Sequence, residues 1–176
     1  MKKIPVIRYA ALIWTLWLFF AVPAFTDDSE ASRRTLKGLS GIYVIVEELQ
    51  PNLLKYEKYT KQFGLNKAGI QRDVEQKLTE AGIRVLSFEE WQKTPGRPVL
   101  YVRVNTHESE KYWFSYDIKV GLRQIATLEA NPGVKTLADT WSLNITGMTN
   151  IGNLKQIQQD LGALLKKFVQ ACSSGK

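Results

Sequence analysis

The sequence predicts an α+β fold, a single domain in which a mixed β-sheet of about five strands carries two main helices on one face. Between residues 42 and 86, an apolar strand-like segment, an amphipathic helical segment and a second strand-like segment follow one another. Between residues 100 and 146, apolar and polar residues alternate as in half-buried strands, and residues 154–171 add a second helical pattern. This order predicts a β-α-β crossover followed by an antiparallel meander.

The first 24 residues have the pattern of an export signal. Residues 1–8 carry three basic side chains, residues 9–22 form an apolar run, and Val22-Pro23-Ala24 offers small residues to a signal peptidase. We therefore expect cleavage near Ala24 and a periplasmic or secreted product without stable membrane insertion. The alternative is a membrane tether formed by an uncleaved N-terminal anchor, although the run is shorter than the roughly 20 residues that span a bilayer.

The rest of the chain is expected to form one folded unit. Residues 25–40 are polar, charged and aperiodic, which is typical of a flexible tether. The single domain is expected to span residues 41–172, followed by a disordered tail over residues 173–176. About 150 residues remain after the signal, which is enough for one packed core and too few for two.

The charge pattern argues against a nucleic-acid partner. The formal net charge is +7, of which the three basic residues of the signal supply +3 and the remaining chain +4. Lys and Arg are interleaved with Asp and Glu over that remaining chain, which is the pattern of a solvated surface. A nucleic-acid-binding domain would instead gather its basic residues into a patch.

Cysteine and histidine usage predicts a domain that depends on its packed core. Cys172 is the only cysteine and His107 the only histidine, so the chain has neither an internal disulfide nor a Cys/His set with zinc-like spacing. We expect no metal and no cofactor. Cys172 is interpreted as a packing residue at the end of the last helix, with a disulfide to a partner chain as the alternative.

The first strand and helix are marked by local signals. Residues 42–49 are β-branched and apolar on both faces for most of their length, which predicts a strand in the interior of a sheet. Asn66 is a candidate N-cap, and Gly82 stands where a helix ends in the left-handed conformation. Residues 83–86 then predict a second, parallel strand. The core stripe of the helix is Ile70, Val74, Leu78 and Ala81.

The second half of the chain predicts three strands and a closing helix. A capping-box pattern over residues 87–90 predicts a helical turn over residues 88–93. Strict alternation over residues 100–105, 112–123 and 140–146 predicts the meander. The closing helix has one apolar stripe, which favours packing on the sheet over the alternative of a coiled-coil seam with another chain.

Catalytic candidates are few. His107 is expected in a loop between two strands with Glu108 and Glu110 beside it, which is more typical of solvated surface than of a base or metal ligand. Asp117 and the glutamate pair Glu89-Glu90 are the other carboxylate candidates, and a helix N-terminus accounts for that pair. The sequence assigns no catalytic residue; a small envelope hydrolase using carboxylates or His107 remains the alternative function.

The exposed face of the predicted sheet is the candidate binding surface. Alternation places aromatic rings beside cations and hydroxyl groups on this face, a combination that suits a peptide, glycan or protein partner. The alternative interpretation is an ordinary half-solvated sheet, or a face covered by residues 53–63. The candidate binding residues are Tyr101, Arg103, Trp113, Lys119 and Arg123, with Ser115, Thr140, Ser142 and Asn144 beside them.

Several segments carry a resemblance to known proteins. The run from Gly64 to Leu86, the strand Tyr101-Val102-Arg103-Val104-Asn105 and Thr140-Trp141-Ser142 resemble a group of exported bacterial proteins of unknown function. The order of elements is also similar to small periplasmic domains such as the amino-terminal domain of the Tol-system translocation protein, although the acylated cysteine of related lipoproteins is absent. The resemblance implies an envelope accessory protein, without an activity to transfer.

Together these observations predict an exported, non-catalytic binding module with an envelope protein or a cell-wall glycan as its partner. The sequence leaves the oligomeric state open.

Overall fold

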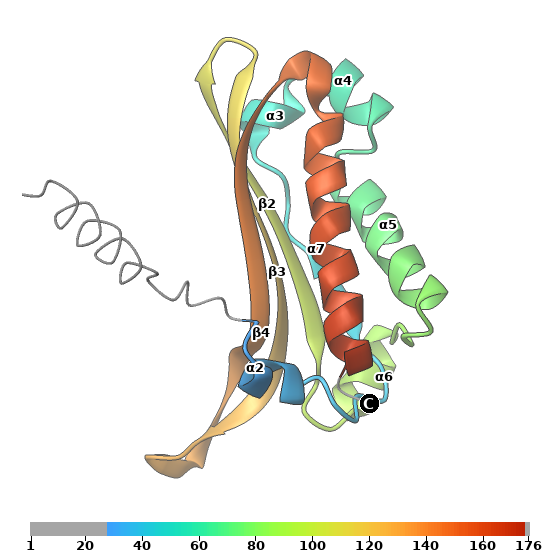
Figure 1. Ribbon diagram of the computed structural model, residues 1–176, viewed down its shortest axis with the longest axis vertical. Coiled ribbons are helices and arrows are strands. Elements are labelled where there is room, and N and C mark those ends of the chain that lie inside the picture. The colour runs from blue at the N-terminus through green and yellow to red at the C-terminus, as the bar shows by residue number, and fades with distance from the viewer. Residues whose placement is uncertain (1–27, 175–176) are drawn as a thin grey trace, which may run out of the picture.

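The computed structural model describes residues 28–174, so the predicted export signal lies outside the described residues. One mixed sheet has the strand order β1-β2-β3-β4, in which β1 pairs in parallel with β2 and the other neighbours are antiparallel (Figure 1). The fold is therefore α+β with a mixed sheet. Among the described residues the sheet has four strands rather than about five: β1 (Tyr43–Val46), β2 (Val99–Glu110), β3 (Trp113–Leu128) and β4 (Asn131–Asn150).

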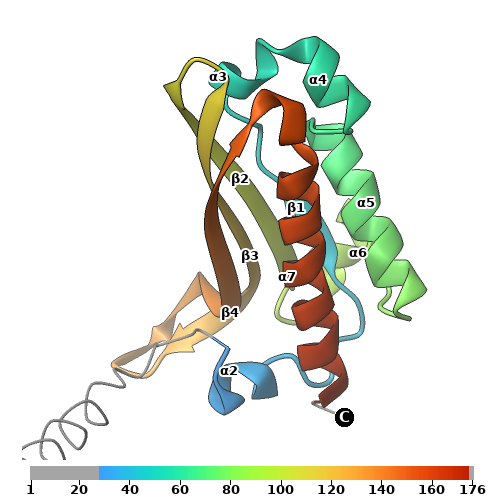
Figure 2. The same cartoon turned by 45° about the horizontal axis from the view of Figure 1, so that its top comes forward.

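Helices cover one face of this sheet. Helix α7 runs along β3 and β4, and α5 lies beside α7 and against β1 (Figures 1 and 2). We call the face under these helices the inner face and the opposite one the outer face. The helices are α2 (Glu30–Arg34), α3 (Pro51–Leu54), α4 (Glu57–Gln62), α5 (Lys67–Glu80), α6 (Phe88–Lys93), a 3-10 turn (Ile151–Asn153) and α7 (Lys155–Ser174).

The core lies between the inner face and the helices. Ile70, Val74 and Leu78 of α5 are buried there, as the spacing predicts. The rings of Trp141 in β4 and Phe168 in α7 pack with their centroids 5.1 Å apart. Every second residue of the central strands enters this core because successive side chains of a strand point to opposite faces.

The helix ends follow their local signals. The Asn66 side chain accepts a hydrogen bond from the Gly69 amide at 2.9 Å, and Gly82 has φ of 73°, which ends α5 in the left-handed region. Ser87 and Glu90 form both hydrogen bonds of a capping box at the start of α6.

The predicted strand over residues 83–86 is the missing fifth strand. It makes a single parallel bridge, Ile42 with Val85, and then leaves the sheet. The Ile83 amide still bonds Leu78 of α5, and Ser87 already caps α6, so two helix ends leave too few residues for a ladder. The parallel partner of β1 is β2, and β1 is an edge strand rather than the interior strand that its sequence predicts.

The loop predicted around His107 is also absent. β2 continues to Glu110, and His107 pairs with Ser115 of β3 in a tight hairpin. The inward side chain of Thr106 is buried, and its hydroxyl donates to Asn52 of α3 at 2.8 Å. This hydrogen bond stabilises β2 past residue 105, where the apolar alternation used for the prediction ends.

Part of the predicted tether contacts the folded body. Residues 30–34 form α2, and Leu36 is buried in the core. The Asp28 carboxylate accepts a 2.7 Å hydrogen bond from the indole of Trp141 and a second one from Arg33. These hydrogen bonds attach the segment to β4 because a side-chain acceptor satisfies the buried indole N–H.

Candidate interaction face of the sheet

The outer face is built from cross-strand rows of side chains on β2, β3 and β4. The strand register aligns Arg103 with Lys119, which in turn lies opposite Asn144. Tyr101 lies one row away, beside Gly121. Parity therefore places the predicted polar and aromatic side chains on the face away from α5 and α7, as the alternation indicates. The remaining rows are Val99-Arg123-Asp139, Asn105-Asp117-Thr146 and His107-Ser115-Met148.

Tyr101 and Arg123 form an ordered pair on this face. The Arg123 guanidinium carbon lies 3.6 Å from the centroid of the Tyr101 ring, which is a close cation–π contact. The Tyr101 hydroxyl donates to Glu47 at the end of β1. Burial and this hydrogen bond raise the pKa of Tyr101, so the phenol stays neutral near pH 7. The aromatic ring and the cation are thus held in place before any partner binds.

Two cations share one carboxylate beside this pair. Asp139 accepts from Lys119 Nζ at 2.6 Å and from Arg123 Nε at 2.7 Å. Burial alone raises the pKa of Asp139, but the hydrogen bonds from Lys119 and Arg123 outweigh it and lower the pKa below its usual value. A bulge in β4 brings Asp139, rather than Thr140, opposite Arg123.

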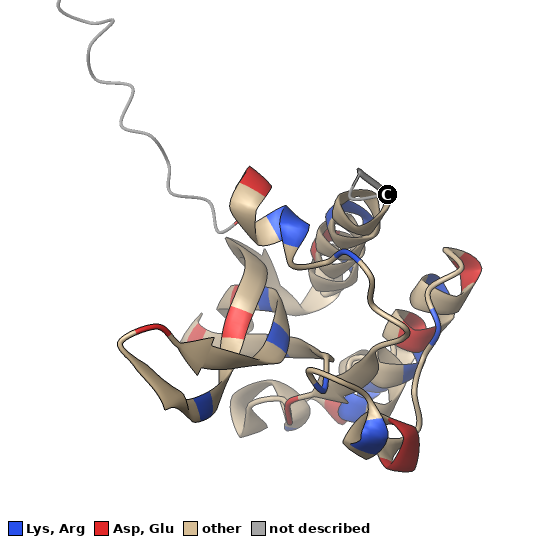
Figure 3. Cartoon of the chain, turned by 90° about the horizontal axis from the view of Figure 1, so that it is seen from below, with Lys and Arg blue, Asp and Glu red and all other residues tan. Residues whose placement is uncertain are grey.

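Arg103 pairs with Asp117 across the strands at 3.3 Å. The ion-pair partner of Asp117 therefore lies on β2. With Glu47 and Asp139, the carboxylates near the centre of the face match the cations Arg103, Lys119 and Arg123 in number. Lys and Arg alternate with Asp and Glu over the ribbon rather than separating into blocks (Figure 3).

Trp113 lies at the far end of the outer face from the other predicted residues. It is six residues from Lys119 along β3, which corresponds to about 20 Å. Its side chain is 46% exposed, and Met148, two residues before its β4 partner Asn150, is 65% exposed. The structure thus groups four of the five predicted binding residues and places the fifth, Trp113, near Met148. The alternation of β4, continued past residue 146, would have predicted that Met148 lies on this face.

The hydroxyl neighbours predicted for this face divide into two groups. Thr140 lies at the bulge, where its hydroxyl accepts from Gln124 at 2.9 Å. Ser142 is buried beside Gly121, whereas Asn144 and Ser115 remain accessible. A bulge inserts one residue into a strand and changes the facing of its neighbours, a feature the alternation alone does not encode.

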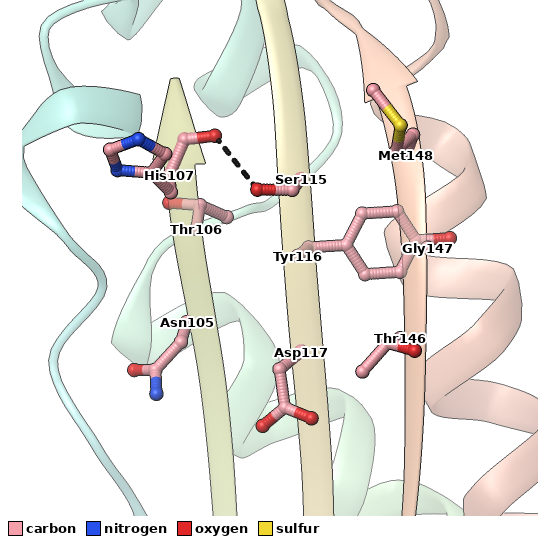
Figure 4. Close-up of a pocket in the computed structure, with 9 residues that line it drawn as sticks. All are labelled: Asn105, Thr106, His107, Ser115, Tyr116, Asp117, Thr146, Gly147 and Met148. Atoms are coloured by element: carbon pink, nitrogen blue, oxygen red, sulfur yellow. Dashed lines mark hydrogen bonds between the residues drawn. The ribbon is translucent and has the colours of Figure 1, made fainter. Parts of the chain in front are cut away.

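His107, Ser115 and Asp117 line one shallow hollow of about 490 Å³ on the outer face (Figure 4). Their contacts do not connect them as a catalytic triad would. Ser115 donates to the carbonyl oxygen of His107 at 3.4 Å, and the imidazole points away from Ser115 and Asp117 (Figure 4). Asp117 binds Arg103 instead. A triad needs the hydroxyl on the imidazole and the imidazole on the carboxylate.

Three glutamates, at positions 47, 90 and 108, have structural partners. Glu108 accepts from Lys55 and Tyr56, and these hydrogen bonds lower the pKa of Glu108 to about 2. Glu90 caps α6, and Glu47 binds Tyr101. Among residues 28–174 no group of three or more His, Cys, Asp or Glu side chains is arranged to hold a metal ion.

Within the same described range, no helix combines the length and apolar content needed to cross a membrane. Comparison of the chain with models of known protein families and with curated proteins finds no match.

Proposed function

We propose that this chain is an exported, non-catalytic binding module that recognises another envelope protein through the outer face of its sheet. The observation that carries the proposal is the composition of this face. At its centre, basic side chains are held in place by ion pairs with carboxylates that neutralise their charge. At one end of the face, Trp113 and Met148 are exposed. Aromatic residues, Met and Arg are the side chains enriched at protein–protein interfaces.

The balance of charge favours a protein over a polyanion as the partner. Arg103, Lys119 and Arg123 each already have a carboxylate partner. They therefore orient a partner through hydrogen bonds, but they leave no net positive charge to attract a polyanion. The stacked pair of Tyr101 and Arg123 also loses little side-chain freedom on binding, because its geometry is fixed beforehand.

Export is the second part of the proposal, and the sequence pattern of residues 1–24 supports it. The resemblance to exported proteins and to Tol-type domains is consistent with an envelope location. Cleavage near Ala24 predicts a mature N-terminus that Edman sequencing of the envelope-extracted protein would identify. A full-length chain in the membrane fraction would support the uncleaved anchor instead.

Site-specific photo-crosslinking in the envelope tests the proposed face. A benzophenone amino acid at position 148 is expected to give one reproducible protein adduct, and the same group at the exposed position 77 of α5 is the matched control. Adding Trp113→Asp and Arg123→Glu should reduce the position-148 adduct at least about tenfold, because it removes an exposed anchor and reverses a central charge. Equal adducts from positions 148 and 77, or an adduct unaffected by the two substitutions, would contradict the proposed face.

A further inference from the structure

We propose that the free edge of β1 is a second binding site, which takes an extended peptide segment as an added strand. The site lies between β1 and the first turns of α5. It is separate from the outer face, and it stands whether or not that face binds a partner.

Hydrogen bonding along β1 defines the free edge. The amides of Tyr43 and Glu47 donate to Pro98 and Val102, at 3.0 and 2.9 Å, so this set of alternate residues faces β2. The other set, which includes Val44, points its N–H and C=O groups in the opposite direction because the backbone groups of successive strand residues alternate.

Only part of this outward edge is satisfied within the chain. Ile42 exchanges two 2.9 Å hydrogen bonds with Arg84 and Leu86, and the Val44 carbonyl accepts from the Gln71 side chain at 3.0 Å. Among the described residues, the amides of Val44 and Val46 donate no hydrogen bond, and the carbonyl of Val46 accepts none. The backbone of the edge is therefore paired with residues 84–86 at Ile42, and the Gln71 side chain caps its carbonyl at Val44. Beyond Val44 its outward backbone groups have no partner among the described residues.

A groove of about 750 Å³ follows the open groups. β1 and Glu48 form one wall, and Asn66, Lys67, Ala68 and Gln71 of the α5 N-terminal region form the other, with a 3.0 Å ion pair from Lys67 to Glu48 at the exposed end. Helix α5 contacts β1 and is the outermost element on that side in Figure 2, so the edge is recessed behind a helix. A recessed edge admits one extended chain, whereas the sheet edge of a second copy would bring its own flanking helix into the same space.

The side chains on the outer side of this edge favour a ligand with apolar residues at alternate positions. Ile45 is 37% exposed on the outer side of β1, and Phe88 is 53% exposed with its ring 6.0 Å from that of Tyr43. A strand added to β1 would place alternate side chains against these residues, as cross-strand neighbours do. The open part of the edge runs from the Val44 amide to Glu48, so it pairs with about five residues of an added strand, which has the same rise per residue.

The sequence of β1 supports the same conclusion. Edge strands are usually protected by Lys, Pro or a bulge, and Tyr43-Val44-Ile45-Val46 has none of these. It has the composition of an interior strand, and an added peptide would make it one. Strand addition of this kind takes its affinity from backbone hydrogen bonds and its specificity from alternate side chains.

Fluorescence anisotropy of the full chain in a mild detergent tests the site. The probes are labelled hexapeptides in which Thr alternates with Val, Ile, Phe or Tyr, and twins whose alternate backbone nitrogens are methylated. Saturable binding is expected for at least one probe, with about a tenfold loss in its methylated twins because they cannot donate to the edge. Ala68→Trp, which fills the groove from an exposed position, should abolish binding, and Thr79→Trp farther along α5 should not.

Three outcomes would overturn the proposal: no probe binds up to millimolar concentration, methylation has no effect, or Ala68→Trp binds as the original chain does. A dimer that Ala68→Trp dissociates, seen by sedimentation, would assign the edge to a second copy instead. Because Trp113→Asp and Arg123→Glu lie outside the groove, peptide binding should survive them, which separates this test from that of the outer face.

Discussion

Gly147 of β4 lies opposite Tyr116 of β3, and the Tyr116 ring extends over it toward α7 (Figure 4). A methyl group at position 147 would stand 2.5 Å from Cζ of that ring, well inside van der Waals contact. The ring cannot move freely, because Tyr116 is 5% exposed and its hydroxyl donates to Asp160 of α7. Burial and this hydrogen bond raise the pKa of Tyr116 to about 12. We therefore expect Gly147→Ala to destabilise the fold.

The size of the effect follows from two opposing contributions. Overpacking a closely packed site costs about 1–3 kcal/mol, while replacing Gly by Ala within a strand recovers roughly 0.5–1 kcal/mol of backbone entropy. In a Tyr116→Val background the ring is absent, so only the second contribution remains and Gly147→Ala should stabilise. The backbone contribution cancels in the double-mutant cycle, which leaves a coupling free energy of about 1–3 kcal/mol between the two positions.

Urea unfolding of the original chain, the two single variants and the double variant measures this coupling. Tryptophan fluorescence is a suitable signal because Trp141 is buried against Phe168. If Gly147→Ala costs the same free energy in both backgrounds, the ring does not lie over the glycine and the packing argument is wrong.

Three further results are expected. The pKa of Glu108 is lowered to about 2, so the stabilisation that the charged carboxylate provides is present above pH 4.5 and is lost as the pH falls toward 2. On acidification, the urea midpoint should therefore fall less for Glu108→Gln than for the original chain. Burial raises the pKa of Cys172 to about 11, so alkylation by iodoacetamide at pH 8 should be slow and should accelerate in urea; equal rates would exclude a buried thiol. Ile125 and Leu137 form an exposed cross-strand pair on the β3–β4 hairpin, so replacing both with Lys should change the unfolding free energy by no more than about 0.5 kcal/mol each, and a larger loss would indicate that they pack against the body.

The features that the sequence predicts best are local. Asn66 and Gly82 mark the ends of α5 because caps depend on residues within one turn, and the capping box at Ser87 has the same origin. The parity of β3 also follows from the sequence because Phe114 and every second residue up to Leu122 are apolar. These signals need no knowledge of distant contacts.

The features that the sequence misses depend on which segments meet. Residues 83–86 have the composition of a strand, but the caps on either side leave them one bridge, at Val85. His107 lies in a strand because Thr106 finds Asn52, which is 54 positions away in the chain. The alternation of the sequence correctly predicts that Tyr101 and its neighbours share the outer face. The ion pairs of that face depend on strand register and on a bulge, which the alternation does not encode.

The topology itself explains why both proposed surfaces are open. Parallel neighbours such as β1 and β2 need a crossover over one face of the sheet, and this connection carries α3, α4 and α5 to the inner side. The antiparallel neighbours are joined by tight hairpins, which have no residues to cover a face. α7 closes the inner side, and α6 reaches the outer side only at Tyr43 and the start of β1. Among residues 28–174, no connecting segment is therefore available for the rest of the outer face or for the edge at Val46, and both remain accessible to another molecule.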